Sequence, residues 1–130
     1  MSTNPASALA AALDAEDYQT ARALLADDCR YEFRGKVIQG ADTIIDSYKT
    51  NGDAGHDRFD SVEFTSDVVS ESDSSARINF TDVVTRSGDT HIHRCSQRVE
   101  FDAVSKIVRI THIDLPGERE ALEQFKTTHP

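Results

Sequence analysis

The second half of the sequence is a run of strands that no helix interrupts. Four segments alternate apolar and polar residues in the manner of half-buried strands, and they span residues 59–70, 76–86, 90–102 and 106–115. Parallel neighbours need long crossover connections, so strands that follow one another this closely must run antiparallel. The pattern excludes a parallel α/β fold and predicts an antiparallel meander with an apolar face that needs a cover.

The first half of the sequence provides that cover. Asn4 and Pro5 predict the start of a helix whose apolar face includes Leu9 and Leu13, and Asp17 predicts the cap of the next helix. The other expected elements are the second helix over 18–26, strands over 29–34 and 36–39, a third helix over 41–50, a mobile loop over 51–55 and a charged terminal helix over 118–126. This order predicts an α+β fold with helices on one face of the sheet.

Composition narrows the class of protein. The 130 residues correspond to a single domain, with a core at about 5–115 and a short helical tail over 116–130. The net charge of −9 argues against nucleic acids and anionic membranes as partners. No apolar run is long enough to span a bilayer, and the first residues lack the basic region of an export signal. We therefore expect a cytoplasmic protein whose Cys29 and Cys95 stay reduced.

Polar residues share the apolar face of the third long strand. Val99 and Phe101 mark its inner side, and the two-residue period places His93, Cys95 and Gln97 on that side as well. The dipeptide at 87–88, Ser-Gly, is typical of a two-residue hairpin turn. That turn pairs Asp82 with His93, Phe80 with Cys95 and Ile78 with Gln97.

The register of the last hairpin depends on its loop. A four-residue loop over 102–105 pairs Val99 with Val108, Gln97 with Ile110, Cys95 with His112 and His93 with Asp114. We prefer this register because it keeps apolar residues opposite one another. A shift by one residue would turn His112 and Asp114 away from the inner face.

The expected cluster of Asp82, His93, Cys95, His112 and Asp114 suits acid–base chemistry. A histidine held between carboxylates has one preferred tautomer and an expected rise in pKa, so Asp82 and His93 are the candidate catalytic pair. The alternative is a solvated structural pair. Asp82, His93, His112 and Asp114 would also suit zinc or iron, but nothing in their spacing demands a metal, and we expect no metal and no cofactor. Cys95 is expected to be a small buried apolar residue rather than a nucleophile.

Four motifs, in this order, resemble those of the NTF2-like superfamily, which includes SnoaL-like proteins and ketosteroid isomerase. They are the residues at 12–17 (ALDAED), 23–29 (ALLADDC), 40–44 (GADTI) and 105–110 (SKIVRI), the last with Ser105 where the family has glycine. The resemblance implies a cystatin-like cone: N-terminal helices packed on a strongly curved, mainly antiparallel sheet that encloses a pocket. It also implies frequent homodimerisation through the outer face of the sheet.

The same resemblance allows the catalytic residues of ketosteroid isomerase to be compared with the residues at the matching positions of this chain. Matching the motifs places Leu9 and Phe33 where ketosteroid isomerase has a tyrosine and its catalytic base, and Gln97 where it has an aspartic acid. Leucine and phenylalanine cannot move protons, so we reject steroid isomerisation by that mechanism. The pocket lining that the cone implies is Tyr18, Tyr31, Tyr48, Phe80, Cys95, Gln97, Ile110, His112 and Asp114.

Two functions remain open. The first is binding of an unknown small molecule, with the Asp82–His93 pair serving as the acid and base of an isomerase, dehydratase or hydrolase. The second is a non-catalytic module for homodimerisation or ligand sensing. A pocket smaller than about 300 Å³ would favour the second function.

Overall fold

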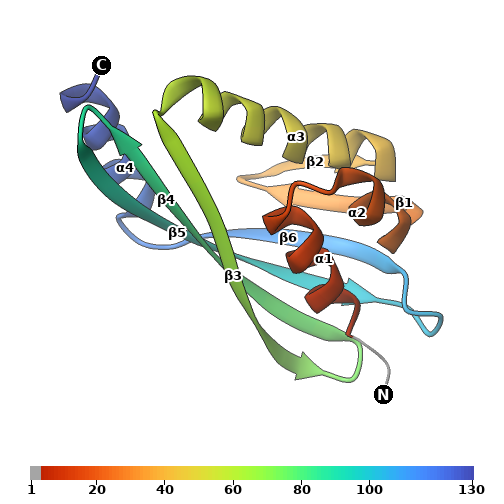
Figure 1. The fold of residues 1–130 in the computed structure, drawn as a ribbon. Helices are drawn as coiled ribbons and strands as arrows, with labels where there is room; N and C mark the ends of the chain where they lie inside the picture. The colour runs from red at the N-terminus through yellow and green to blue at the C-terminus, as the bar shows by residue number, and fades with distance from the viewer. Residues whose placement is uncertain (1–3) are drawn as a thin grey trace.

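The computed structural model describes residues 4–130, which form helices packed on a curved sheet (Figure 1). The elements in chain order are α1 (Pro5–Asp14), α2 (Tyr18–Leu24), β1 (Leu25–Phe33), β2 (Lys36–Gln39), α3 (Ala41–Arg58), β3 (Ser61–Ser72), β4 (Ser75–Arg86), β5 (Asp89–Phe101), β6 (Ile107–Asp114) and α4 (Glu118–Thr128). The strand order in the sheet is β2-β1-β6-β5-β4-β3. Every neighbouring pair is antiparallel except β1 and β6. This is the α+β cone that the sequence predicted.

Polar caps define the starts of the first two helices. The Asn4 side chain accepts a 2.7 Å hydrogen bond from the Ala6 amide, and Asp17 Oδ1 accepts one of 3.2 Å from the Thr20 amide. The predicted end of the second helix is wrong by two residues. Leu25 is already extended and pairs with Ile107 across the parallel ladder, so β1 begins four residues earlier than expected.

The expected loop over 51–55 is wrong, because these residues are helical and α3 continues to Arg58. Gly52 and Gly55 lower helix propensity but do not end this helix. Gly52 is buried where the Tyr18 hydroxyl of α2 approaches α3, and a Cβ at that position would lie 2.8 Å from the hydroxyl oxygen. The glycine that suggested a loop therefore permits a close contact between two helices.

The β4–β5 register is confirmed, including the pairs that join Asp82 to His93 and Phe80 to Cys95. The predicted β5–β6 register is wrong by two residues, since Cys95 pairs with Asp114 and Gln97 pairs with His112. The connecting loop is longer than expected, and a β-bulge precedes it between residues 100 and 101.

Asp102 organises that loop. Its Oδ1 accepts hydrogen bonds from the amides of Val104 and Lys106, at 3.0 and 2.9 Å, while Ser105 adopts a φ of 63°. A shift of two residues preserves the side of the sheet that each side chain faces, so His112 still points inward.

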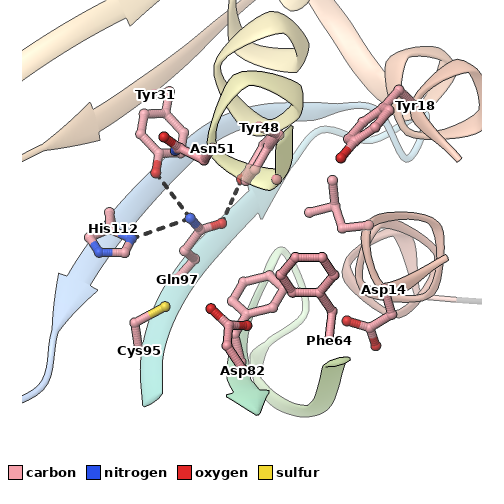
Figure 2. Close-up of a pocket in the computed structure, with 13 residues that line it drawn as sticks. Asp14, Tyr18, Tyr31, Tyr48, Asn51, Phe64, Asp82, Cys95, Gln97 and His112 are labelled. Atoms are coloured by element: carbon pink, nitrogen blue, oxygen red, sulfur yellow. Dashed lines mark hydrogen bonds between the residues drawn. The ribbon is translucent and has the colours of Figure 1, made fainter. Parts of the chain in front are cut away.

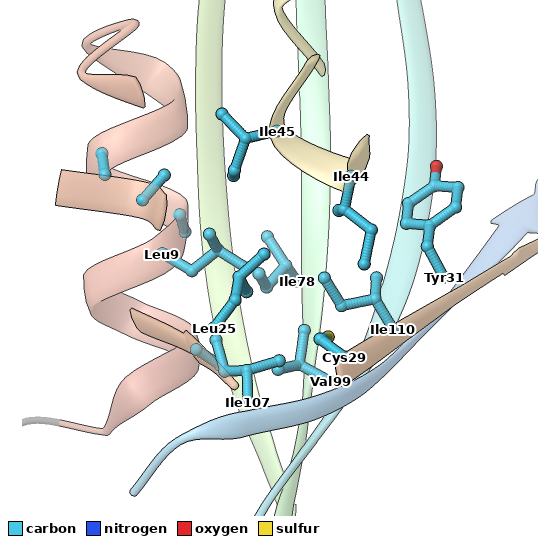
Figure 3. Packing of buried hydrophobic residues seen from close by; sticks show 14 of the residues in the cluster. Leu9, Leu25, Cys29, Tyr31, Ile44, Ile45, Ile78, Val99, Ile107 and Ile110 are labelled. Atoms are coloured by element: carbon cyan, nitrogen blue, oxygen red, sulfur yellow. The ribbon is translucent and has the colours of Figure 1, made fainter. Parts of the chain in front are cut away.

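The main core lies between α1, α3 and the inner face of the sheet (Figure 3). Its largest fully buried side chains are Leu9, Leu25, Ile44, Ile78, Val99, Ile107 and Ile110. A smaller cluster of Phe59, Val84 and Phe125 attaches α4 at the end of the cone near the β4–β5 turn. None of the helices described in residues 4–130 is long and apolar enough to cross a membrane.

Candidate functional site

A cavity of about 190 Å³ lies inside the cone, between the helices and the concave face of the sheet (Figure 2). Helices α1, α2 and α3 form one wall, and strands β1 and β3–β6 form the other. The lining residues are Leu13, Asp14, Tyr18, Tyr31, Tyr48, Asn51, Gly52, Phe64, Phe80, Asp82, Cys95, Gln97 and His112.

Most of the predicted pocket residues lie on this lining. The exceptions are Ile110, His93 and Asp114. Ile110 is fully buried in the core below the cavity, and Asp114 forms a bidentate ion pair with Arg34 at 2.7 and 2.9 Å. His93 faces a second, neighbouring cavity, and no hydrogen bond joins its ring to the Asp82 carboxyl.

Sequence reasoning missed five lining residues, which are Leu13, Asp14, Asn51, Gly52 and Phe64. Asn51 and Gly52 were missed because residues 51–55 were expected to form a loop, whereas they belong to α3. Asp14 could have been found from its position directly after Leu13, which ends the apolar stripe of α1. Phe64 could have been found from the alternation of its own strand, in which Val62, Phe64 and Val68 share one face.

Gln97 connects the polar side of the cavity. Its side chain is only 3% exposed, and its Oε1 accepts a 2.6 Å hydrogen bond from the Tyr48 hydroxyl. Its Nε2 donates to the Tyr31 hydroxyl at 3.1 Å and to His112 Nδ1 at 3.3 Å. These are the dashed contacts of Figure 2. The Tyr31 oxygen already accepts a bond here, so its own proton is available to a ligand.

The histidine in this network is neutral. His112 Nε2 donates to Asp114 Oδ1 at 2.9 Å, which leaves Nδ1 as the acceptor for Gln97. Burial lowers the pKa of His112 and outweighs the opposing effect of the Asp114 carboxylate. Burial also lowers the pKa of His93. The expected rise in histidine pKa is therefore wrong, because desolvation exceeds the attraction of the carboxylates.

Two carboxyl groups, those of Asp14 and Asp82, line the cavity away from the Gln97 network (Figure 2). Asp14 Oδ2 accepts a hydrogen bond from the Ser66 hydroxyl, whereas Oδ1 is buried without a partner among residues 4–130. The Asp82 carboxyl makes no side-chain hydrogen bond or ion pair with any described residue, although its backbone pairs within the sheet. Burial, and secondarily the charge of Asp14, raises the pKa of Asp82 to about 6. Asp82 can therefore both accept and return a proton near neutral pH.

The surroundings of the cysteine on the lining disfavour its thiolate form. Burial, followed by the charges of nearby carboxylates, raises the pKa of the Cys95 thiol to about 12. A thiol in that state is a poor nucleophile at neutral pH. Within the part of the chain that the structure describes, no group of three or more His, Cys, Asp or Glu side chains is arranged to hold a metal.

The second cavity has a volume of about 240 Å³ and shares Asn51, Phe64 and Asp82 with the first. It lies between the C-terminal half of α3, the sheet and α4. Each cavity is below the size of about 300 Å³ that separates the two functions considered above, so cavity volume by itself favours the non-catalytic module. Asp82 is on both linings, so a ligand in either cavity would lie next to it.

Comparisons with known proteins agree with this architecture. No protein-family model matches the sequence, and no curated protein matches it. The solved structures to which the chain is similar include a proposed polyketide cyclase from Xanthomonas campestris pv. campestris, with a TM-score of 0.69, 15% identity and coverage of 97% of this chain and 94% of that chain.

Two further solved structures have a similar overall fold. A Mycobacterium tuberculosis protein in complex with estradiol-17β-hemisuccinate has a TM-score of 0.65 and 15% identity over 88% of this chain and 93% of that chain. An NTF2-like protein of unknown function from an Exiguobacterium species has a TM-score of 0.62 and 14% identity over 86% of this chain and 98% of that chain. The chain described here has the NTF2-like fold.

Proposed function

We propose that this protein binds a small, mostly apolar carbonyl compound in the cone and transfers a proton on it without a cofactor. The observation that carries this proposal is one juxtaposition. The Asp82 carboxyl, which has no partner among the described residues, faces the same cavity as the Tyr31 hydroxyl, whose proton is available. A base and a hydrogen-bond donor around one apolar space are the components of enolisation.

The two residues have complementary tasks. A substrate carbonyl oxygen accepts a hydrogen bond from Tyr31, while the Asp82 carboxylate removes a proton from the carbon next to that carbonyl. Burial raises the pKa of Tyr31 to about 12, so this hydroxyl stays protonated and remains a donor as negative charge develops on the oxygen. The apolar rings of Phe64 and Phe80 exclude water, which strengthens that hydrogen bond.

The fate of the enolate distinguishes the reaction classes. Where the substrate has a β,γ double bond, return of the proton from Asp82 to the γ-carbon moves that double bond and completes an isomerisation. Loss of a hydroxyl group from the β-carbon, which leaves as water with the proton returned by Asp82, completes a dehydration. The geometry supports these two outcomes more directly than hydrolysis, because the cavity presents one base and one donor to a carbonyl group. The similarity to a proposed polyketide cyclase is consistent with carbonyl chemistry in such a cone.

The Asp82–His93 pair stays a prediction. The two residues occupy paired positions on β4 and β5, which supports a shared site. His93 faces the second cavity, however, and lacks a hydrogen bond to Asp82. We therefore assign the first proton transfer to Asp82 and the oxygen contact to Tyr31.

Hydrogen–deuterium exchange on a carbonyl probe tests the proposal without knowledge of the product. 2-Tetralone in D₂O, followed by proton NMR, should exchange its α-protons faster with the wild-type protein than with Asp82→Asn. Asp46→Asn is the matched control, because Asp46 is exposed on α3 away from the cavity. Equal exchange by wild type and Asp82→Asn would overturn the proposal and favour the ligand-sensing module.

We also propose that the chain forms a homodimer through the outer face of the sheet. Apolar Ile92 and Val69 are 42% and 54% exposed there, and the same face carries ion pairs such as Arg109–Glu32 at 2.7 Å. Light scattering during size-exclusion chromatography tests this proposal, and a monomer at micromolar concentration would contradict it. The cytoplasmic location stays a prediction from the sequence.

A further inference from the structure

The second cavity differs from the first in charge. Its lining carries two cations, Arg58 at the end of α3 and Lys126 on α4, whereas the lining of the first cavity contains no Lys or Arg. The chain as a whole has a net charge of −9, so two cations on one cavity lining next to Asp82 stand out. They would favour an anionic ligand in this cavity.

We propose that the second cavity binds the carboxylate end of the substrate, so that the ligand is an apolar carboxylic acid with a carbonyl group. Its carboxylate would lie between Arg58 and Lys126, and its carbonyl would lie between Asp82 and Tyr31. This inference rests on the proposed function for the identity of the carbonyl group alone, because anion binding can be measured separately.

Arg58 is held in position for such a contact. One Nη of its guanidinium donates to the backbone carbonyls of Lys126 and His129, at 2.7 and 3.0 Å. The other two guanidinium nitrogens have no partner among residues 4–130. Bonds to one nitrogen fix the plane of the group while its remaining N–H donors stay available, which is the arrangement that recognises a carboxylate.

Lys126 is free to join the same ligand. Its Nζ lies 3.3 Å from Glu123, whose side chain is 72% exposed. An exposed i,i+3 pair of this kind contributes little to stability. A desolvated carboxylate in the cavity would therefore compete successfully with Glu123 for the ammonium group.

His93 adds a third polar group. Its Nδ1 is buried and has no hydrogen-bond partner among the described residues, and its ring lines this cavity. A buried unpaired nitrogen is costly, and a ligand oxygen would relieve that cost. The remaining lining is largely apolar, with Phe59, Val62, Val84 and Leu122. This lining suits a carboxylate attached to a hydrocarbon body better than a free inorganic anion.

A pair of probes with the same shape and different charge tests the subsite. Isothermal titration should show that the wild-type protein binds 2-naphthoate about tenfold or more tightly than 2-naphthamide, as expected for charge-assisted hydrogen bonds. Lys126→Met and Arg58→Gln should each remove most of this preference and leave naphthamide binding unchanged. Lys49→Met removes a cation of α3 that is on neither lining and should preserve the preference.

Binding of the neutral probe distinguishes a variant that has lost only the carboxylate subsite from one that has lost its fold. A variant in which α4 undocks would bind both probes more weakly. Arg58→Lys keeps the positive charge, so it should retain part of the preference for 2-naphthoate over 2-naphthamide. Equal affinity of wild type for both probes overturns the carboxylate subsite, whether or not Asp82 catalyses exchange on 2-tetralone. Failure of both probes to bind also overturns it. Tight naphthoate binding without exchange would support the subsite and contradict the proposed catalysis.

Discussion

The Gln97 side-chain amide lies 3.1 Å from the Tyr31 hydroxyl and donates to its oxygen, while the Tyr48 hydroxyl donates its proton to the other end of the same amide. The two tyrosines therefore differ in what they can offer a ligand. Tyr31 retains a proton for the cavity, whereas the proton of Tyr48 is already engaged.

This difference predicts unequal effects of two matched substitutions. Tyr31→Phe should slow exchange on 2-tetralone by about 100-fold, because it removes the donor to the developing oxyanion. Tyr48→Phe removes an oxygen bonded to the same amide and should slow exchange by less than about tenfold, with a loss of stability of about 1 kcal/mol. Equal effects on kcat in both variants would contradict the assignment of Tyr31 as the donor.

The rate of exchange should depend on the ionisation of Asp82. Only the carboxylate form accepts a proton, and the pKa of Asp82 is about 6. We expect kcat/KM for exchange to rise with pH through about 6 and to level off above about pH 7. A profile that is flat between pH 5 and 7, or one that falls with increasing pH, would exclude Asp82 as the base.

Asp82 should also reduce the stability of the fold. A carboxyl group whose folded pKa of about 6 exceeds its unfolded value of 3.8 binds more protons in the folded state between those values. The free energy of unfolding therefore falls as pH rises through this window, by up to about 3 kcal/mol from this group. Asp82→Asn should be about 1–3 kcal/mol more stable than wild type at pH 7.5, and this gap should close as the pH falls to about 4. Urea denaturation of both proteins across this range measures the gap, with Asp46→Asn as the control.

Two glycines in α3 should respond differently to alanine. Gly55→Ala should stabilise the protein by about 0.5–1 kcal/mol, because the new methyl group meets only Val62 at 3.7 Å and helix propensity improves. Gly52→Ala should lose that gain, since its methyl group would lie 2.8 Å from the Tyr18 hydroxyl oxygen. The double variant Gly52→Ala/Tyr18→Phe should recover it. Equal stabilisation by both single substitutions would show that Tyr18 does not constrain this helix.

Phe125 should control the docking of α4. Its ring stacks on His91 and His129, with centroid distances of 5.2 and 4.2 Å, and is only 8% exposed. Phe125→Ala should cost about 2–4 kcal/mol in the docking of α4. Hydrogen exchange should show the amides of α4 losing protection while those around Ile110 keep theirs. Exposed Gln124 offers the control Gln124→Ala, and equal loss of protection throughout the sheet would contradict a separate α4 unit.

Short-range chemistry made much of this fold predictable. Asn4 and Asp17 cap the helices that follow them, and the Ser87-Gly88 turn sets the β4–β5 register because two residues leave no freedom in pairing. These signals depend only on neighbouring residues. They placed Asp82, Cys95 and Gln97 on the inner face before any tertiary contact was known.

The pairing of β5 with β6 could not be predicted from neighbouring residues, because the loop between them is longer. In the β5–β6 loop, Asp102 accepts two backbone hydrogen bonds and Ser105 adopts a positive φ, so the loop is longer than expected and the register moves by two residues. Because the move is even, His112 still faces inward. Asp114 moves opposite Cys95, and in the structure its carboxylate pairs with Arg34.

By itself, the sequence determined the order of the elements, the α+β class and the inward face of the long strands, because caps, tight turns and two-residue alternation are local. The conical shape was expected from the resemblance to the NTF2-like superfamily. Only the tertiary structure decided that α3 continues past Gly52, that Asp14 joins Asp82 at the cavity, and that His93 faces a separate space beside α4. These outcomes depend on contacts between α1, α2, α3, α4 and the sheet. Residues distant in the sequence meet there, and burial raises the pKa of one carboxyl and lowers that of two histidines.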